Sequence, residues 1–139
     1  MDLTAFIAYV RCHGDAVLST LGPEGEPQAA FLSIAVTDEG ELVFDAKDAS
    51  RKIQNIRRDP RVAIVLGGAD GTTMQVQGVA DIPTGAGLDR CAAAYARAFP
   101  EFADSLVNPK VTVVRIVPQW ARHGDYRSKP PQVSVVDLS

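Results

Sequence analysis

Short apolar runs separated by tight turns fill the first third of the chain and restrict its fold more than any other feature. Three such runs cover residues 16–21, 29–36 and 42–46. The first two are joined by the turn cluster at 22–27, and the last two by the turn at 38–40. Loops this short connect strands that run in opposite directions, because parallel strands need a crossover of about a dozen residues or more. The pattern therefore predicts an antiparallel meander.

The rest of the chain adds strands and connecting helices. Between residues 73 and 82, apolar residues alternate with others that include Gln75 and Gln77, which predicts a strand with one buried face. Further strands are predicted at residues 62–66 and 111–117, with an edge strand at 133–136. Helices are predicted at residues 3–12, 50–59 and 84–99. Five or six antiparallel strands with two or three helices predict a small barrel or sandwich of the α+β class.

Composition limits the chain to a few classes of protein. It has 139 residues, of which 46% are hydrophobic and 22% charged, so residues 1–139 are expected to form one domain. The net charge of −3 argues against a general nucleic-acid-binding protein. There is no signal-peptide pattern and no run of about 20 apolar residues, and the widely spaced Cys12 and Cys91 suit a reducing compartment. We therefore expect a cytoplasmic protein without a membrane partner.

The helix predicted after Ser50 carries cations where a helix disfavours them. Ser50 is a suitable N-cap, so Arg51 and Lys52 fall in the first turn. The positive end of the helix dipole opposes each cation by about 0.3–1 kcal/mol unless an anion lies between them. Arg57 and Arg58 lie near the other end of the helix, where the dipole favours them. The first pair therefore predicts a local phosphate site, and the alternative is a surface helix that carries basic residues for solubility.

The order of these segments resembles the pyridoxamine 5'-phosphate oxidase-like family of FMN-binding split β-barrels. The fairly specific part of the resemblance is Ser50-Arg51-Lys52 followed by Asn55-Ile56-Arg57-Arg58-Asp59-Pro60-Arg61-Val62. Weaker matches lie at residues 16–27, 42–44, 78–80 and 115–122. The resemblance covers nearly the whole chain. It implies a six-stranded antiparallel split barrel, mainly β within the α+β class, with two to three connecting helices.

The resemblance also implies a cofactor and a partner. The FMN phosphate is expected on Ser50, Arg51 and Lys52, the same site that the helix dipole indicates. A homodimer is expected, with the isoalloxazine ring in a groove between the subunits. The resemblance places a further set of side chains around that ring: Leu32, Ser33, Asp45 and Ala46 beside it, Gln75 from the partner, and Trp120 or Arg122 at its edge.

The function implied is an FMN-dependent oxidoreductase acting on a small-molecule substrate or electron donor. Residues 29–36 carry no cation, whereas the oxidase proper has basic residues on this strand as further phosphate ligands, so phosphate binding here rests on fewer charges. The substrate site of the oxidase proper also needs a basic C-terminal cluster, and this chain offers only Arg122, His123, Arg127 and Lys129 without a clear match, so pyridoxamine phosphate is not the expected substrate. The alternatives are a deazaflavin-dependent reductase, a non-enzymatic flavin-binding or stress-related protein, and a haem-binding protein. His13 and His123 are the only histidines, and neither is clearly a catalytic base or an axial ligand. No metal site is expected.

Overall fold

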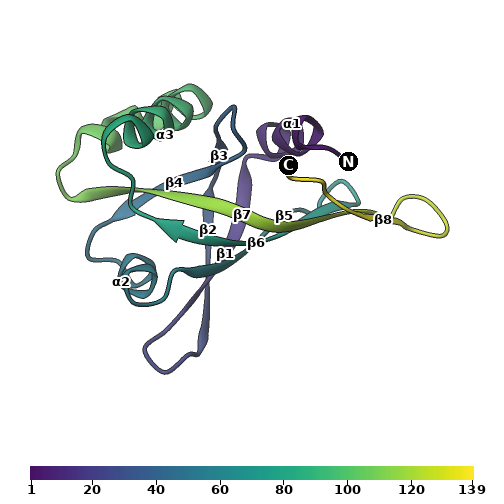
Figure 1. The fold of residues 1–139 in the computed structure, drawn as a ribbon, viewed down its shortest axis with the longest axis horizontal. Helices are drawn as coiled ribbons and strands as arrows, with labels where there is room; N and C mark the ends of the chain where they lie inside the picture. The colour runs from purple at the N-terminus through teal and green to yellow at the C-terminus, as the bar shows by residue number, and fades with distance from the viewer.

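The strands of the protein form one curled antiparallel sheet, which a computed structural model describes together with its helices for residues 1–139. The strand order is β2-β1-β5-β6-β7-β4-β3, and β8 pairs with β7. In chain order the elements are α1 (Leu3–His13), β1 (Asp15–Leu21), β2 (Pro27–Ser33), β3 (Ala35–Val36), β4 (Leu42–Lys47), α2 (Arg51–Arg58), β5 (Arg61–Gly67), β6 (Thr72–Asp81), α3 (Gly85–Ala98), the 3-10 helix η1 (Pro100–Val107), β7 (Val111–Asp125) and β8 (Gln132–Val135). Figure 1 shows the sheet curling into a half-barrel. The expected α+β antiparallel split barrel is confirmed, with eight strands in place of six.

One extra strand arises because the apolar run at residues 29–36 is broken. Its first part belongs to β2, which pairs with β1, whereas β3 pairs with β4. Between them, the amide of Ile34 donates to the carbonyl of Gly14 at 2.8 Å. The chain changes partner at this residue, so a continuous apolar run becomes two strands.

Strand β7 is also longer than the sequence predicts, because it passes through Pro118 without ending. Gln77 pairs with Trp120 and Gly78 with Pro118, so Gln119 is the extra residue of a β-bulge. A Cβ on Gly78 would lie 2.7 Å from the carbonyl oxygen of Val117, so the close approach of the two strands requires glycine. Beyond the bulge β7 pairs with β8, whereas its first half pairs with β4.

The helices close the open ends and one face of this sheet. Phe6 and Val10 of α1 and Ile53 of α2 are fully buried in the main core cluster. Helix α3 covers a smaller cluster that includes Val43 and Tyr95. In Figure 1, α3 and α2 lie on opposite sides of the left end of the sheet. No helix combines the length and the apolarity needed to cross a membrane.

A buried carboxylate fixes α3 to the sheet. Glu41 accepts bonds from Arg90 Nε at 2.7 Å and Nη2 at 3.0 Å, from Thr37 Oγ1 at 3.0 Å and from Arg115 Nη1 at 3.3 Å. Glu41 is only 8% exposed. The Arg90 guanidinium holds the pKa of the Glu41 carboxyl below its usual value, although burial opposes this. The network joins α3, β7 and the chain entering β4 through one acid.

Candidate cofactor site

Helix α2 begins with a serine whose hydroxyl has no partner. Ser50 has the extended conformation of an N-cap, with φ −68° and ψ 155°, but its side chain makes no capping bond. Its Oγ atom is buried and makes no hydrogen bond. The backbone amides of residues 51–53 also donate to no backbone carbonyl, as helix geometry requires of a first turn. A buried hydroxyl without a partner is unusual, because leaving it unpaired costs about 1–3 kcal/mol.

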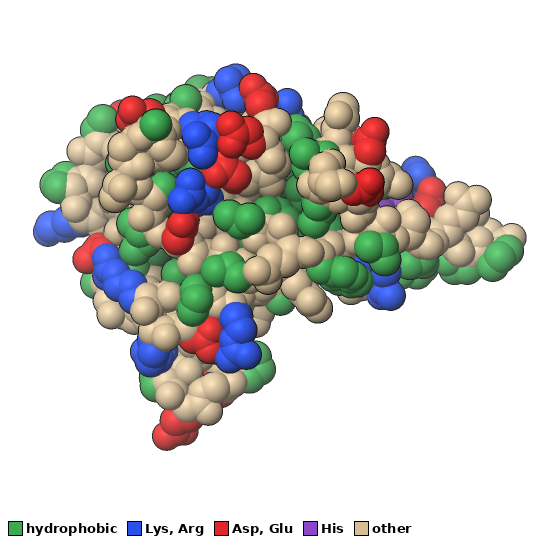
Figure 2. Space-filling model, viewed as in Figure 1, with side chains coloured by type: hydrophobic (Ala, Val, Ile, Leu, Met, Phe, Trp, Pro, Cys, Tyr) green, Lys and Arg blue, Asp and Glu red, His purple; other side chains and the backbone are tan.

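The two cations that follow Ser50 are also unpaired. Neither Arg51 nor Lys52 has a carboxylate within ion-pair distance, and no salt bridge includes either residue. At the other end of the helix, Arg57 Nη2 lies 2.7 Å from Asp48 Oδ1. Figure 2 shows Lys and Arg side chains gathered over the part of the molecule that contains α2. The N-terminus of α2 therefore combines free amides, a free hydroxyl and two free cations, all of which favour an anion.

A small cavity of about 160 Å³ separates this turn from the β1–β2 hairpin. Arg51 and Lys52 line one side of it, and the hairpin supplies the other wall, which consists of Leu18, Thr20, Gln28, Ala29 and Ala30. The helix side of the cavity is cationic, and the strand wall combines the apolar Leu18, Ala29 and Ala30 with the polar Thr20 and Gln28. Its volume suits a phosphate-sized group, because whole drug-sized ligands occupy about 300 Å³ or more.

Sequence reasoning missed three polar residues that support the cavity, namely Asn55, Thr20 and Gln28. Asn55 is 3% exposed, and its Nδ2 donates to Thr20 Oγ1 and to Gln28 Oε1, both at 2.9 Å. Arg58 Nη2 in turn donates to Asn55 Oδ1 at 2.7 Å. Asn55 thus fixes the position of α2 against both strands of the hairpin. The one available signal was a polar residue between Ile53 and Ile56 on the apolar side of the helix.

The expected ring-flanking residues occupy two separate places. Leu32 packs against the main core and lies on the same face of β2 as Gln28, because side chains on a strand alternate. Ser33 faces the other way and pairs with Asp15. Both continue the strand that borders the cavity. The structure therefore brings Leu32 to the cavity side of β2 and places Ser33 on the opposite side.

The pair on β4 lies away from the cavity. Asp45 accepts a short hydrogen bond from Ser105 Oγ, which directs the carboxylate toward η1. Burial raises the pKa of Tyr95, and the neighbouring Asp45 carboxylate adds to this effect. Ala46 instead packs against the main core. Neither Asp45 nor Ala46 lines the cavity beside Arg51 and Lys52, so their contact with a cofactor stays a prediction.

Gln75, Trp120 and Arg122 meet on the outer face of the sheet. Gln75 is opposite Arg122 in the β6–β7 register, and the Arg122 guanidinium carbon lies 5.9 Å from the Trp120 ring centroid. A hollow of about 330 Å³ beside them also includes Val17 and Ser19 of β1. The cavity at α2 is lined by Leu18 and Thr20 of the same strand, which point the other way. Within one subunit, the hollow beside Gln75 and Trp120 and the cavity at α2 therefore lie on opposite faces of β1.

This outer face is unusually apolar for a surface. Four exposed apolar residues belong to one row of cross-strand neighbours across the sheet: Phe31 at 73% exposure, Val135 at 59%, Val65 at 41% and Val17 at 37%. Gln75 and Arg122 complete the row. Phe31, Val17 and Val65 are adjacent in this row, and an exposed apolar patch of this kind is typical of an interaction surface.

His13 lies at the C-terminus of α1, outside the cavity beside α2. Its Nδ1 lies 2.8 Å from the Tyr9 carbonyl oxygen and its Nε2 lies 2.8 Å from Asp70 Oδ2. Both nitrogens face acceptors, so the geometry favours the doubly protonated ring. Burial opposes that charge, but the bonds to Asp70 and Tyr9 outweigh it and raise the pKa of His13. Because both ring nitrogens of His13 are already hydrogen-bonded, the ring is poorly placed to act as a base. The structure also contains no cluster of three or more potential metal ligands.

The family profile of pyridoxamine 5'-phosphate oxidase matches residues 4–124. The chain belongs to this family. The match includes every element from α1 to nearly the end of β7, and therefore the α2 cavity and the outer sheet face apart from β8.

Individual relatives are more distant. A 63-residue segment is 35% identical to a 5a,11a-dehydrotetracycline/5a,11a-dehydrooxytetracycline reductase from Streptomyces rimosus, and this segment is 43% of the chain and 44% of the reductase. A pyridoxamine 5'-phosphate oxidase-related, FMN-binding protein from Nostoc punctiforme superposes with a TM-score of 0.71 at 16% identity, over 96% of this chain and 86% of that one. A heme-binding protein from Mycobacterium smegmatis gives a TM-score of 0.79 at 22% identity, over 97% of this chain and 60% of that one. The two structural likenesses show the shared fold.

Proposed function

We propose that the protein is an FMN-dependent oxidoreductase that binds the cofactor phosphate at the N-terminus of α2. The observation that carries the proposal is the buried Ser50 hydroxyl without a partner, next to two cations without acids. A structural N-cap would have used that hydroxyl on its own helix, as Asp2 does in α1. A phosphate would accept bonds from the hydroxyl, from the free amides and from both cations at once.

The residues of the site fit FMN in charge and in placement. The cavity between α2 and the hairpin has room for the phosphate, and the apolar face of β2 that contains Leu32 leads away from it. When bound, the flavin would supply hydride and electron transfer, and the chain would supply binding, orientation and control of access. The FMN-binding relative from Nostoc punctiforme and the Streptomyces reductase support this choice of cofactor and reaction class. The substrate or electron donor would be a small molecule.

A homodimer would complete the site. Gln75, Trp120 and Arg122 cannot face the α2 cavity of their own subunit, because they lie on the other face of the sheet. A second copy packed on the apolar row of Phe31, Val17, Val65 and Val135 would bury that exposed surface and bring these polar side chains to the ring edge. Ser33 lies on this outer face of the sheet and could join the groove, whereas contact of Asp45 and Ala46 with the ring stays a prediction.

The test removes the two cations from the first turn. The double variant Arg51→Ala, Lys52→Ala should weaken FMN binding by at least about 100-fold, because each charge-assisted bond contributes about 1.5–3 kcal/mol. The control is Arg57→Ala with Lys110→Ala, which removes the same charge from exposed positions outside the cavity. Binding is followed by quenching of FMN fluorescence, and folding by circular dichroism.

Equal FMN affinity in the wild type and the Arg51/Lys52 variant would overturn the proposed site. A purified protein that ignores FMN and instead retains haem, seen as a Soret band, or a deazaflavin would overturn the choice of cofactor. A monomer by light scattering at the concentration of the binding assay would contradict the inter-subunit groove.

A further inference from the structure

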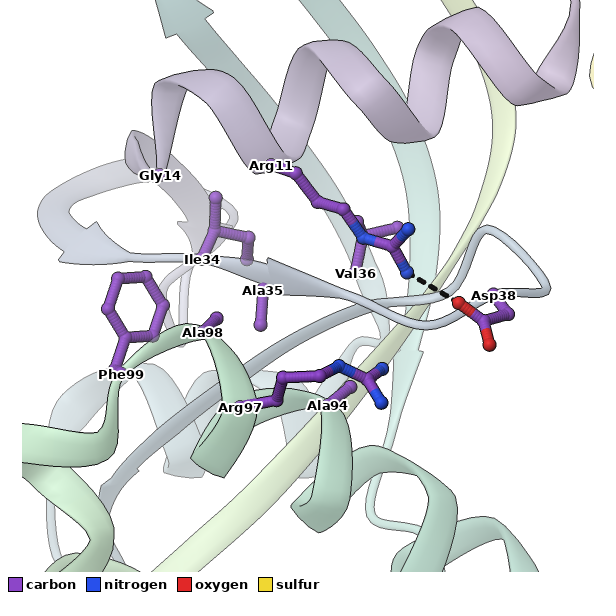
Figure 3. Close-up of a pocket in the computed structure, with 10 residues that line it drawn as sticks. All are labelled: Arg11, Gly14, Ile34, Ala35, Val36, Asp38, Ala94, Arg97, Ala98 and Phe99. Atoms are coloured by element: carbon purple, nitrogen blue, oxygen red, sulfur yellow. Dashed lines mark hydrogen bonds and ion pairs between the residues drawn. The ribbon is translucent and has the colours of Figure 1, made fainter.

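A second groove lies between α1, β3 and α3, on a part of the surface that the cofactor site does not use. Its volume is about 400 Å³, within the usual range for small-molecule pockets. It shares no lining residue with the cavity at Arg51 and Lys52. Figure 3 shows its floor, formed by Ile34, Ala35 and Val36, with α1 on one side and α3 on the other.

The greater part of the groove is apolar. Ile34, Ala35 and Val36 are only 1–3% exposed, so the floor is a fixed part of the core. On the α3 wall, Ala94 and Ala98 are one helical turn apart and leave space where longer side chains would fill it. Phe99 ends the groove on the side of Gly14, and Figure 3 shows its ring standing beside the floor. This half offers an apolar surface with an aromatic end wall.

The other end of the groove carries charge of mostly one sign. Arg11 from α1 and Arg97 from α3 extend from opposite walls toward the same end, where Asp38 lies (Figure 3). Arg11 Nη2 is 2.6 Å from Asp38 Oδ1, and Arg11 keeps the pKa of that carboxyl below its usual value. Arg97 takes part in no salt bridge or side-chain hydrogen bond, but its charge acts on the same Asp38 carboxylate and adds to the lowering of its pKa. Two cations and one carboxylate leave one positive charge unmatched.

We propose that this groove binds a small organic monoanion, an aromatic carboxylate, at a site separate from that of the cofactor. The carboxylate would pair with Arg97 and reach Arg11, since guanidinium groups match carboxylates in two parallel bonds. The aromatic body would lie on the alanines of α3 with its far edge at Phe99. A single unmatched charge favours a carboxylate over a phosphate monoester, which carries about −1.5 to −2 at neutral pH.

The probe is 2-naphthoate, and its neutral amide, 2-naphthamide, is the matched control ligand. Each is titrated into ¹⁵N-labelled protein while amide chemical shifts are followed. We expect naphthoate to shift the amides of Ala94, Arg97, Ala98 and Phe99, and naphthamide to bind more weakly by up to about fivefold, the size of an exposed ion pair. Shifts confined to the outer face of the sheet, or equal affinity for both ligands, would overturn the proposal.

Two variants separate the charge from the shape of the groove. Arg97→Gln should weaken naphthoate by about fivefold and leave naphthamide unchanged. Ala98→Leu places a larger side chain on the groove wall and should weaken both ligands, and its exposed helical position tolerates leucine. Arg57→Gln is the control for loss of an exposed arginine. Unaltered naphthoate binding in Arg97→Gln, or an equal loss in Arg57→Gln, would show that Arg97 does not recognise the acid.

Discussion

The substitution Ser50→Ala distinguishes a ligand-binding hydroxyl from a structural N-cap by the sign of its effect. An N-cap serine that bonds its own helix loses about 1 kcal/mol of stability when replaced by alanine. Ser50 makes no such bond, and its buried Oγ has no partner. Removing an unpaired buried hydroxyl relieves part of a desolvation cost of about 1–3 kcal/mol. We therefore expect the FMN-free variant to be more stable than the wild type by about 1 kcal/mol.

The same substitution should act in the opposite direction on FMN binding. One hydrogen bond to a charged phosphate is lost, which corresponds to about 1.5 kcal/mol, or roughly tenfold in the dissociation constant. Stability is measured by urea unfolding of the FMN-free protein, and affinity by fluorescence titration. The pairing of a stabilised free protein with a weakened complex is the signature of a hydroxyl reserved for a ligand.

The matched control is the N-cap of α1, where Asp2 Oδ1 accepts from the Ala5 amide at 2.9 Å. Asp2→Ala should lose about 1 kcal/mol of stability and leave FMN affinity unchanged. If Ser50→Ala instead behaves as Asp2→Ala does, with lower stability and unaltered FMN affinity, Ser50 is a structural cap and the reasoning is wrong.

Further predictions concern the network on α3, the pH response of α1 and the bulge in β7. Glu41→Gln should lower the free energy of unfolding by about 2 kcal/mol, below the usual cost of breaking a buried pair because Arg90 is partly exposed. Since the folded-state pKa of Glu41 is lowered, its contribution is present at neutral pH and lost in acid, so wild type and variant should converge below about pH 4 in urea unfolding at a series of pH values. Burial opposes the charge on His13, but the bond to Asp70 outweighs burial and raises the pKa of His13. Its contribution to the free energy of unfolding is therefore complete in mild acid and lost as pH rises above about 6.5. His13→Gln should abolish that loss, and an unchanged pH profile of stability would contradict it. Gly78→Ala should lower the thermal midpoint clearly, because its Cβ would meet a backbone carbonyl of β7 at 2.7 Å, whereas an unchanged midpoint would show that the bulge can relax.

Sequence reasoning located the strands that have one buried face and missed the places where a strand changes partner. The alternation in residues 73–82 predicted β6, which spans Thr72–Asp81. The break at Ile34 carried no signal, because every residue around it is apolar or small and the cause is a bond to Gly14. The extension of β7 was missed because Pro118 reads as a strand end, and only the bulge opposite Gly78 accommodates it.

The charged part of the candidate site was predictable, and its support was not. The misfit of Arg51 and Lys52 with the helix dipole follows from sequence position alone. The bonds from Asn55 to Thr20 and Gln28 join residues 27 and 35 positions apart, which no local pattern encodes. The outer-face residues required the strand register as well. A local electrostatic anomaly can thus indicate a site before its walls are known.

The long strand β7 also determines when the chain can fold. It supplies the neighbour that both β6 and β4 need, and its register joins Leu42 to Ile116. During synthesis, a chain that has reached only the end of α3 therefore exposes the unpaired edges of two strands, and such edges are templates for aggregation. The half-barrel closes only after residues 111–125 have left the ribosome, so this one segment sets both the timing of folding and the period in which the nascent protein needs protection.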